Sequence, residues 1–184
     1  MPMETWQCLT KKTILDHNSF LSIESHTVQL PKGEIIPDWP IIITPDYVDV
    51  LVQDTAGKFL IFSQYKYAVG GQSLAPIGGY LEKDEDPLVG AKRELLEETG
   101  YISDQWVKLG EYQVDANRGA GIAHLYLARA AREVQPREAD DLEEQQLVRM
   151  DRSELDNAIM SGGFKVLAWC MVVVLGLRYL DQEP

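Results

Sequence analysis

The sequence is poor in cysteine and has no apolar run long enough to cross a membrane. Its two cysteines, Cys8 and Cys170, have no spacing that could ligate zinc or build a disulfide framework, which favours a reducing, cytoplasmic setting. The longest apolar run, residues 166–177, is shorter than the roughly 20 residues that a bilayer requires, so it predicts a buried helix. Residues 1–9 lack the basic and apolar blocks of a signal peptide. We therefore expect no membrane partner.

Basic residues are also scarce. The chain has 17 Lys and Arg against 29 Asp and Glu, and its formal net charge at pH 7 is −12. This balance argues against a nucleic-acid partner, because a nucleic-acid surface needs a basic footprint. It also restricts how the chain can bind phosphate. An acidic protein must offset the repulsion locally, with divalent cations or with a few well-placed Arg and Lys side chains.

The length of 184 residues suits one well-buried domain with a modest appendage. We expect the appendage at residues 1–45 and the domain at residues 46–184. Short β-type runs, separated by Asn, Pro and Gly, predict that the appendage is an antiparallel β-structure. These runs are residues 13–15, 20–23, 26–30 and 41–44.

Alternation of β-type and helical patterns predicts the elements of the larger domain. Residues 47–52 and 59–67 are β-rich segments joined by a turn, which predicts a hairpin. The glycine-rich stretch 69–79 predicts a loop or a strand end, and the acidic segment 135–146 predicts a loop. The other expected elements are strands at 106–114, 122–128 and 147–150 and helices at 153–160 and 165–180.

The clearest element is a helix that begins after Asp86. Asp86 can cap the free amides of the first turn, Pro87 fits that turn, and Gly100 suits a left-handed C-terminus. Small or apolar side chains recur along it at spacings of three and four and predict its buried face. They are Leu88, Ala91, Leu95 and Thr99.

Three carboxylates on this helix indicate its chemistry. Glu94, Glu97 and Glu98 fall on one side, because steps of three and four residues return to nearly the same azimuth. Their repulsion costs roughly a few tenths of a kcal/mol per pair, so a positive partner is expected among them. Oxygen-rich clusters favour hard cations, and Mg²⁺ in particular keeps waters and accepts phosphate oxygens. Gly78 and Gly79 let the backbone approach closely, so their carbonyls are further candidate ligands.

The segment from Gly79 to Tyr101 resembles the Nudix box. In order it has Gly79, five residues, Glu85, seven residues, and then the run Arg93-Glu94-Leu95-Leu96-Glu97-Glu98-Thr99-Gly100-Tyr101. Tyr101 stands where an aliphatic residue is usual. The resemblance implies a hydrolase of the α/β class, with a Nudix-type α/β/α sandwich built on a mixed sheet.

The resemblance also assigns roles to the residues of the box. Glu97, Glu98 and Arg93 are expected among the catalytic residues, and Arg93 would brace the carboxylates by ion pairs. Glu85 would orient the loop and the helix, and Gly100 would end the helix. The expected ligands of Mg²⁺, or of Mn²⁺ as the alternative ion, are Glu94, Glu97, Glu98 and a carbonyl of Gly78 or Gly79.

The rest of the chain is similar to ADP-ribose and ADP-sugar pyrophosphatases, through Trp6, the N-terminal strands and the runs 64–67 and 124–128. This similarity implies Mg²⁺-dependent hydrolysis of the diphosphate bond of ADP-ribose or a related ADP-sugar. It also implies a homodimer in which the N-terminal strands contact substrate across the interface. The alternative is that these strands only cover one side of the monomer. Two features depart from the group: Ala75 replaces a common acidic residue, and residues 114–119 lack a usual proline.

The base that activates water is expected in the acidic loop beyond the box. Glu143 best matches a base or an additional metal ligand in the similar pyrophosphatases, and Glu144 and Asp141 are the alternatives. Lys66 and Arg118 are candidates for contact with phosphate, with an ordinary surface charge as the other interpretation.

Two other functions stay open on the sequence. One is a Nudix enzyme that hydrolyses nucleoside triphosphates or dinucleoside polyphosphates. The other is a Nudix-like module that binds a nucleotide without catalysis. Product analysis separates the two enzymes, and ligand binding without metal-dependent turnover would favour the module.

Overall fold

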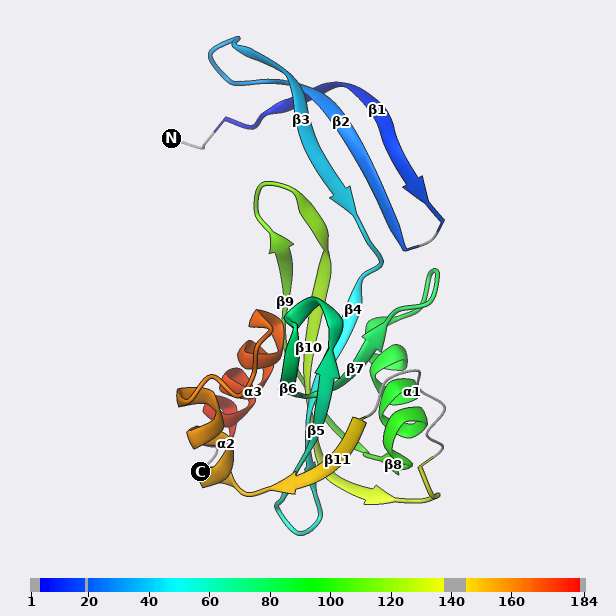
Figure 1. Ribbon diagram of the computed structural model, residues 1–184, viewed down its shortest axis with the longest axis vertical. Coiled ribbons are helices and arrows are strands. Elements are labelled where there is room, and N and C mark those ends of the chain that lie inside the picture. Colours follow the sequence, from blue (N-terminus) through cyan, green and yellow to red (C-terminus); the bar gives the residue numbers. More distant parts are fainter. Residues whose placement is uncertain (1–3, 19, 138–144, 183–184) are drawn as a thin grey trace. The chain divides into compact units, whose positions relative to one another are not determined.

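The computed structural model of the protein describes residues 4–18, 20–137 and 145–182 (Figure 1). The chain forms two compact units. The N-terminal unit comprises Met1–Asp46 and Tyr112–Ile122, and the larger unit comprises Tyr47–Glu111 and Ala123–Pro184. From the sequence, all of residues 46–184 were expected in one domain. The structure instead associates Tyr112–Ile122 with the N-terminal strands.

The N-terminal unit is an antiparallel sheet of β1 (Gln7–His17), β2 (Leu21–Gln29) and β3 (Ile35–Ile43). The short β-type runs of the sequence therefore belong to three longer strands. Residues 112–122 join this unit because Gly119 pairs with Ile42, whose amide donates to the Arg118 carbonyl at 2.8 Å. Val28 is the one buried residue among the described residues of the unit.

The larger unit is built on a mixed sheet. The strands β4 (Tyr47–Asp54) and β5 (Phe59–Lys66) pair antiparallel, which confirms the expected hairpin. The strands β10 (Gly119–Glu133) and β11 (Gln145–Met150) extend this hairpin to the order β10-β4-β5-β11, which contains one parallel pair, β10 with β4. The remaining strands lie off this path, with β6 on β5, β7 on β4, and β8 and β9 on β10. The bounds of all strands beyond β5 are β6 Gly71–Ala75, β7 Ile77–Tyr80, β8 Tyr101–Ile102, β9 Gln105–Asp115, β10 Gly119–Glu133 and β11 Gln145–Met150. A 3₁₀ turn lies at Tyr67–Val69.

Helices cover both faces of this sheet (Figure 1). One core lies between the sheet and α1 (Pro87–Thr99), and alternate residues of β4 such as Val48 and Val50 face it. A second core lies between the sheet and α2 (Arg152–Met160) with α3 (Leu167–Leu180). The larger unit is therefore the expected α/β/α sandwich.

Two expectations about local structure need correction. The glycine-rich stretch 69–79 contains the strands β6 and β7, because β5 and β4 offer backbone partners that a sequence pattern does not show. The apolar run 166–177 is buried on one face only, and the side chain of Leu167 is 90% exposed. Within the described residues, no helix has the length and apolar character to span a membrane.

Candidate active site

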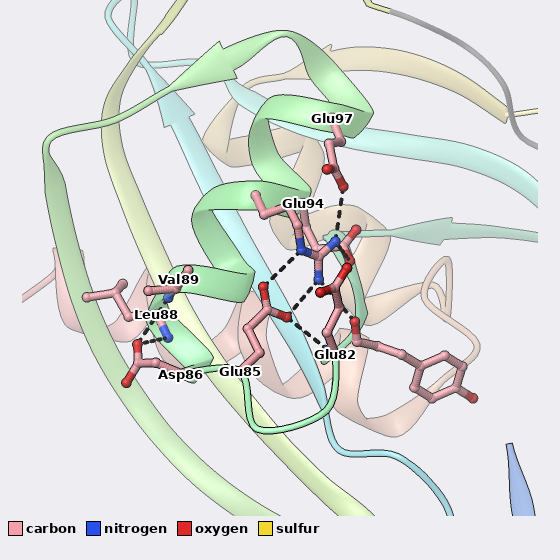
Figure 2. A network of polar contacts seen from close by, with 9 residues as sticks. Glu82, Glu85, Asp86, Leu88, Val89, Glu94 and Glu97 are labelled. Atoms are coloured by element: carbon pink, nitrogen blue, oxygen red, sulfur yellow. Dashed lines mark hydrogen bonds and ion pairs between the residues drawn. The ribbon is translucent and has the colours of Figure 1, made fainter. Parts of the chain in front are cut away.

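Helix α1 carries the acidic residues of the box, and local chemistry fixes both of its ends. The Asp86 side chain accepts hydrogen bonds from the amides of Leu88 and Val89 at 3.0 and 3.1 Å (Figure 2). Gly100 ends the helix with a φ of 74°, a conformation that suits glycine because it has no Cβ. Both ends agree with the sequence prediction.

The packed face of α1 fixes its rotation. Ala91 and Leu95 have no exposed surface, and Thr99 is 2% exposed while its hydroxyl donates to the Leu95 carbonyl. Leu88 packs against the same core. The predicted apolar face is therefore confirmed. Since it is held against the sheet, the glutamates are turned toward β7 and the loop that follows it.

Gly78 and Gly79 of β7 lie between carboxylates and leave no room for side chains. A Cβ at Gly79 would lie 2.4 Å from an oxygen of the Glu94 carboxylate. A Cβ at Gly78 would lie 2.1 Å from a backbone oxygen of β4 and 3.0 Å from Asp49 Oδ1. The amide of Gly78 donates to Glu98 Oε2 at 3.3 Å. The two glycines thus allow three carboxylates to approach one short backbone segment.

Arg93 forms hydrogen bonds with three acidic side chains of the box, Glu85, Glu94 and Glu97, which are labelled in Figure 2. Its Nε and Nη2 donate to the two oxygens of Glu85, both at 2.9 Å. Its Nη1 donates to Glu94 at 2.7 Å and to Glu97 at 3.0 Å. Its Nη2 also donates to the Tyr80 carbonyl at 3.2 Å. The ion pairs expected from Arg93 to the carboxylates are therefore present.

Glu85 links the loop before α1 to the helix itself. Besides the two bonds from Arg93, its carboxylate accepts the Glu82 amide at 2.9 Å. The hydrogen bond from Arg93 is the main reason why the pKa of Glu85 is lowered. The side chain is therefore ionised at neutral pH and holds the turn 82–85 against the guanidinium.

The electrostatics of the box favour binding of a cation. Burial raises the pKa of Glu94, and the hydrogen bond from Arg93 opposes that rise. Glu85, Glu94 and Glu97 share a single guanidinium, so the network has a surplus of negative charge. Carboxylate oxygens next to the backbone of Gly78 and Gly79, which have no side chains, are suitable ligands for a hard divalent ion.

The glutamates are not arranged around a common ion position. In the described part of the chain, no three His, Cys, Asp or Glu side chains are gathered so as to hold one metal ion. Glu94 and Glu97 point to Arg93, and Glu98 points to the Gly78 amide. The residues therefore fit a divalent cation by chemistry and proximity. Rotation of Glu94 and Glu97 away from Arg93 would be needed to ligate it.

Asp49 is a residue of this region that the sequence analysis missed. It lies on β4 opposite Gly78, is 3% exposed, and its Oδ2 is buried without a hydrogen-bond partner among the described residues. Burial of Asp49 raises its pKa to about 7. The pKa of Tyr47 is raised to about 12, mainly by burial of its own hydroxyl and secondly by the nearby Asp49 charge. The available signal was an acidic residue inside the apolar strand 47–52.

Tyr101, which departs from the usual Nudix pattern, belongs to a polar network at the end of the box. It accepts a short hydrogen bond from Arg149 and donates to Glu133 at 3.3 Å. The Arg149 guanidinium also lies 5.9 Å from the centre of the Tyr101 ring. An aliphatic residue could not make these polar contacts, so the departure has a structural reason.

The other candidate residues belong to other parts of the chain. Lys66 ends β5 opposite Gly71. Arg118 belongs to the N-terminal unit and forms an ion pair with Asp115 at 3.6 Å. The candidates for the base, Glu143 with Glu144 and Asp141, lie outside the described residues.

A Nudix family model, described as "NUDIX domain", matches residues 44–170. The chain belongs to the Nudix family. It is a pyrophosphohydrolase of that family, whose members generally use divalent metal ions. A solved structure titled "Crystal structure of ADP compounds hydrolase" superposes with a TM-score of 0.83 at 15% identity, covering 98% of this chain and 97% of the other. That likeness shows the shared fold.

Three curated proteins are similar in sequence to this Nudix chain. The methanol dehydrogenase activator of Bacillus methanolicus is 30% identical over 81% of each chain. The ADP-ribose pyrophosphatase of Bacillus subtilis (strain 168) is 28% identical over 82% of each. The CMP-5'-(N-acetyl-N-hydroxy-3-aminopropyl)phosphonate hydrolase of Streptomyces rubellomurinus is 27% identical over 93% of this chain and 83% of that protein.

Proposed function

We propose that this Nudix enzyme uses Mg²⁺ to hydrolyse the diphosphate bond of ADP-ribose or a related ADP-sugar, giving AMP and a sugar phosphate. The observation that carries the proposal is the Gly78 and Gly79 backbone, which lies between the Glu94 and Glu98 carboxylates. The similarity to an ADP-ribose pyrophosphatase over 82% of the chain supports the substrate class.

The glutamates of α1 and Arg93 have different roles in the proposed reaction. Glu94, Glu97 and Glu98, with a carbonyl of Gly78 or Gly79, would hold the metal. Bound Mg²⁺ would neutralise the diphosphate and lower the pKa of a water molecule. Arg93 holds Glu94 and Glu97 in the structure, and once these two carboxylates turn to the metal it would stay beside them through its ion pair with Glu85. Its planar guanidinium suits this role because it can bind several oxygens at once.

Hydrolysis also needs a base and a contact for the departing phosphate. We assign the base to Glu143, with Glu144 and Asp141 as alternatives that variants must separate. The base takes a proton from water while the water oxygen attacks one phosphorus, and the bond from that phosphorus to the bridging oxygen breaks. Lys66 and Arg118 are assigned to the phosphate oxygens, because the chain's net charge of −12 requires local cations at an anionic substrate.

A substrate panel tests the proposal directly. Purified protein is incubated with ADP-ribose, ADP-sugars, nucleoside triphosphates, dinucleoside polyphosphates and a CDP-linked compound. Each incubation contains Mg²⁺, Mn²⁺ or a chelator, and the products are separated by chromatography. We expect AMP and ribose 5-phosphate from ADP-ribose with Mg²⁺. Preferential turnover of triphosphates or of the cytidine compound would refute the substrate assignment, and nucleotide binding without turnover would refute the catalytic one.

We also propose a homodimer formed through the N-terminal unit. All residues of β1 are exposed, and large apolar side chains such as Ile14 at 60% and Ile35 at 53% face solvent. A thin sheet with so little buried surface needs a partner for stability. Light scattering coupled to gel filtration should give twice the chain mass, and Ile14→Lys should give a monomer while Thr13→Lys does not. A monomeric parent protein would contradict this proposal.

A further inference from the structure

A cysteine, a histidine and a glutamate form a linked set on the N-terminal sheet, outside the Nudix box. Cys8 lies on β1 and its thiol is exposed. Its Sγ is 3.7 Å from Nδ1 of His26 on β2. The other ring nitrogen of His26, Nε2, is 2.7 Å from Oε2 of Glu24 on the same strand. Lys11 lies directly opposite His26 in the strand register.

The contact with Glu24 selects one tautomer of the neutral His26 imidazole. A carboxylate only accepts hydrogen bonds when ionised, so Glu24 selects the tautomer in which His26 Nε2 carries the proton. Nδ1 then has a lone pair that can accept the Cys8 thiol proton, which the Thr10 carbonyl, 3.6 Å from Sγ, can also accept. This is the arrangement of a nucleophile, a base and a carboxylate that orients the base.

The surroundings support a reactive thiol instead of an inert one. The His26 side chain is 12% exposed and that of Glu24 is 21% exposed, so water competes little for their hydrogen bond. Cys8 itself is open to reagents. Register partners in an antiparallel pair share a face, so Lys11 adds positive charge on the side where a thiolate would form. Cys170, on α3, belongs to the second core of the larger unit.

We propose that Cys8 is a thiol-modification site that exchanges with small disulfides, with His26 as its base and Glu24 as the positioning residue. His26 Nδ1 takes the Sγ proton, and the thiolate attacks one sulfur of the disulfide. A new S–S bond forms as the old one breaks, and the second sulfur leaves with the electron pair and takes the proton from His26. One thiol and one disulfide give one mixed disulfide and one thiol, so the incoming disulfide is the oxidant.

The size of the expected effect follows from the chemistry of thiols. An ordinary thiol is only a few per cent ionised at neutral pH, so a base that accepts the thiol proton during the attack can raise the rate by at most about 30-fold. We expect Cys8 to react about three- to tenfold faster in the folded protein than in the unfolded chain.

The test uses 2,2′-dithiodipyridine, a neutral disulfide, because the chain's charge of −12 would repel an anionic reagent. In the Cys170→Ser protein Cys8 is the only thiol, and release of pyridinethione at pH 7 gives its rate in buffer and in guanidinium. His26→Gln should reduce the rate to that of the unfolded chain. Glu24→Gln should reduce it by a smaller factor, and Ser25→Ala, on the other face of β2, should leave it unchanged.

The controls separate loss of the base from loss of the fold. Circular dichroism and thermal unfolding verify that each variant is folded, and mass spectrometry verifies that the adduct is on Cys8. If folded Cys8 reacts no faster than the unfolded chain, or if His26→Gln leaves the rate unchanged in a folded protein, the proposal is wrong. The assay follows a thiol, so its outcome does not depend on the proposed substrate of the box.

Discussion

The two units of this enzyme differ sharply in how much they bury. The larger unit has two cores with fully buried residues on both faces of its sheet, such as Leu95 of α1 and Leu155 of α2. The N-terminal unit buries only Val28 among its described residues. Burial supplies most of the free energy of folding. The larger unit therefore has its own stability, whereas the sheet of β1–β3 depends on additional contacts.

The largest predicted effect concerns activity in the larger unit. Glu98→Gln keeps an acceptor for the Gly78 amide but removes the charge, so the fold should remain intact. We expect kcat to fall by roughly 10²–10⁴-fold, the range for loss of one essential ionised group. Release of AMP from ADP-ribose is the measurement, and Glu82→Gln, at the start of the neighbouring turn, is the control. Full activity of the Glu98 variant would show that α1 is not the metal platform.

The second prediction compares the cores of the two units. Leu95→Ala should lower the free energy of unfolding by about 2–5 kcal/mol, because it leaves a cavity under α1. Ile14→Ala, on the exposed β1, should change it by less than about 0.5 kcal/mol in dilute protein. Urea unfolding measures both. Equal losses in the two variants would contradict the difference in burial, and a loss for Ile14 that grows with protein concentration would support the dimer.

The third prediction concerns the pH dependence of stability in the larger unit. The pKa of Asp49 is raised from 3.8 to about 7 in the folded protein by burial. Between these two values the unfolded chain has lost the proton and the folded chain has kept it, so stability falls as the pH rises through this window. The loss is up to about 4 kcal/mol and is complete above pH 7. Below pH 4 both states are protonated and the effect is absent.

Asp49→Asn should remove this dependence. With a chelator present to exclude bound metal, the variant should be more stable than the parent at pH 8 and similar to it near pH 4. Thermal unfolding across this pH range is the measurement, and Asp104→Asn, whose side chain is 88% exposed, is the control. An identical pH profile for the parent and the Asp49 variant would show that Asp49 ionises freely.

The smallest prediction concerns the start of α1. Asp86→Ala removes the acceptor of the Leu88 and Val89 amides and should lower the free energy of unfolding by about 1 kcal/mol. Asp86→Asn keeps an acceptor and should restore most of the loss. Thermal unfolding detects this difference. No loss in the alanine variant would mean that packing of the buried face alone holds the helix.

Local signals explain which parts of the fold could be predicted. Asp86 and Gly100 mark the ends of α1 by chemistry that acts within a few residues, and the spacing of its glutamates places them on one side. The hairpin of β4 and β5 also depends on a short turn. Pairing between strands that are far apart in the sequence leaves no local pattern of this kind. The association of residues 112–122 with the N-terminal unit depends on the pairing of Gly119 with Ile42, two residues that are 77 positions apart in the sequence.

The site was predictable in its composition but not in its contacts. The motif named Glu94, Glu97 and Glu98, yet it could not show that the first two contact Arg93 while the third accepts the Gly78 amide. Asp49 was not predicted because its burial results from the packing of β4 against neighbouring elements. A rule based on residue spacing cannot show such packing. Sequence patterns identify donors and acceptors, and the fold decides which of them meet.

The chain passes between the two units three times, after residues 46, 111 and 122. Removal of the first 46 residues would therefore leave the strand tip at 112–122 behind, without Ile42 and Trp39, whose N–H groups bind the carbonyls of Arg118 and Asn117. Bare strand edges recruit other chains. A shortened enzyme of this kind should aggregate, and any exchange of the N-terminal sheet between relatives has to transfer both pieces of sequence together.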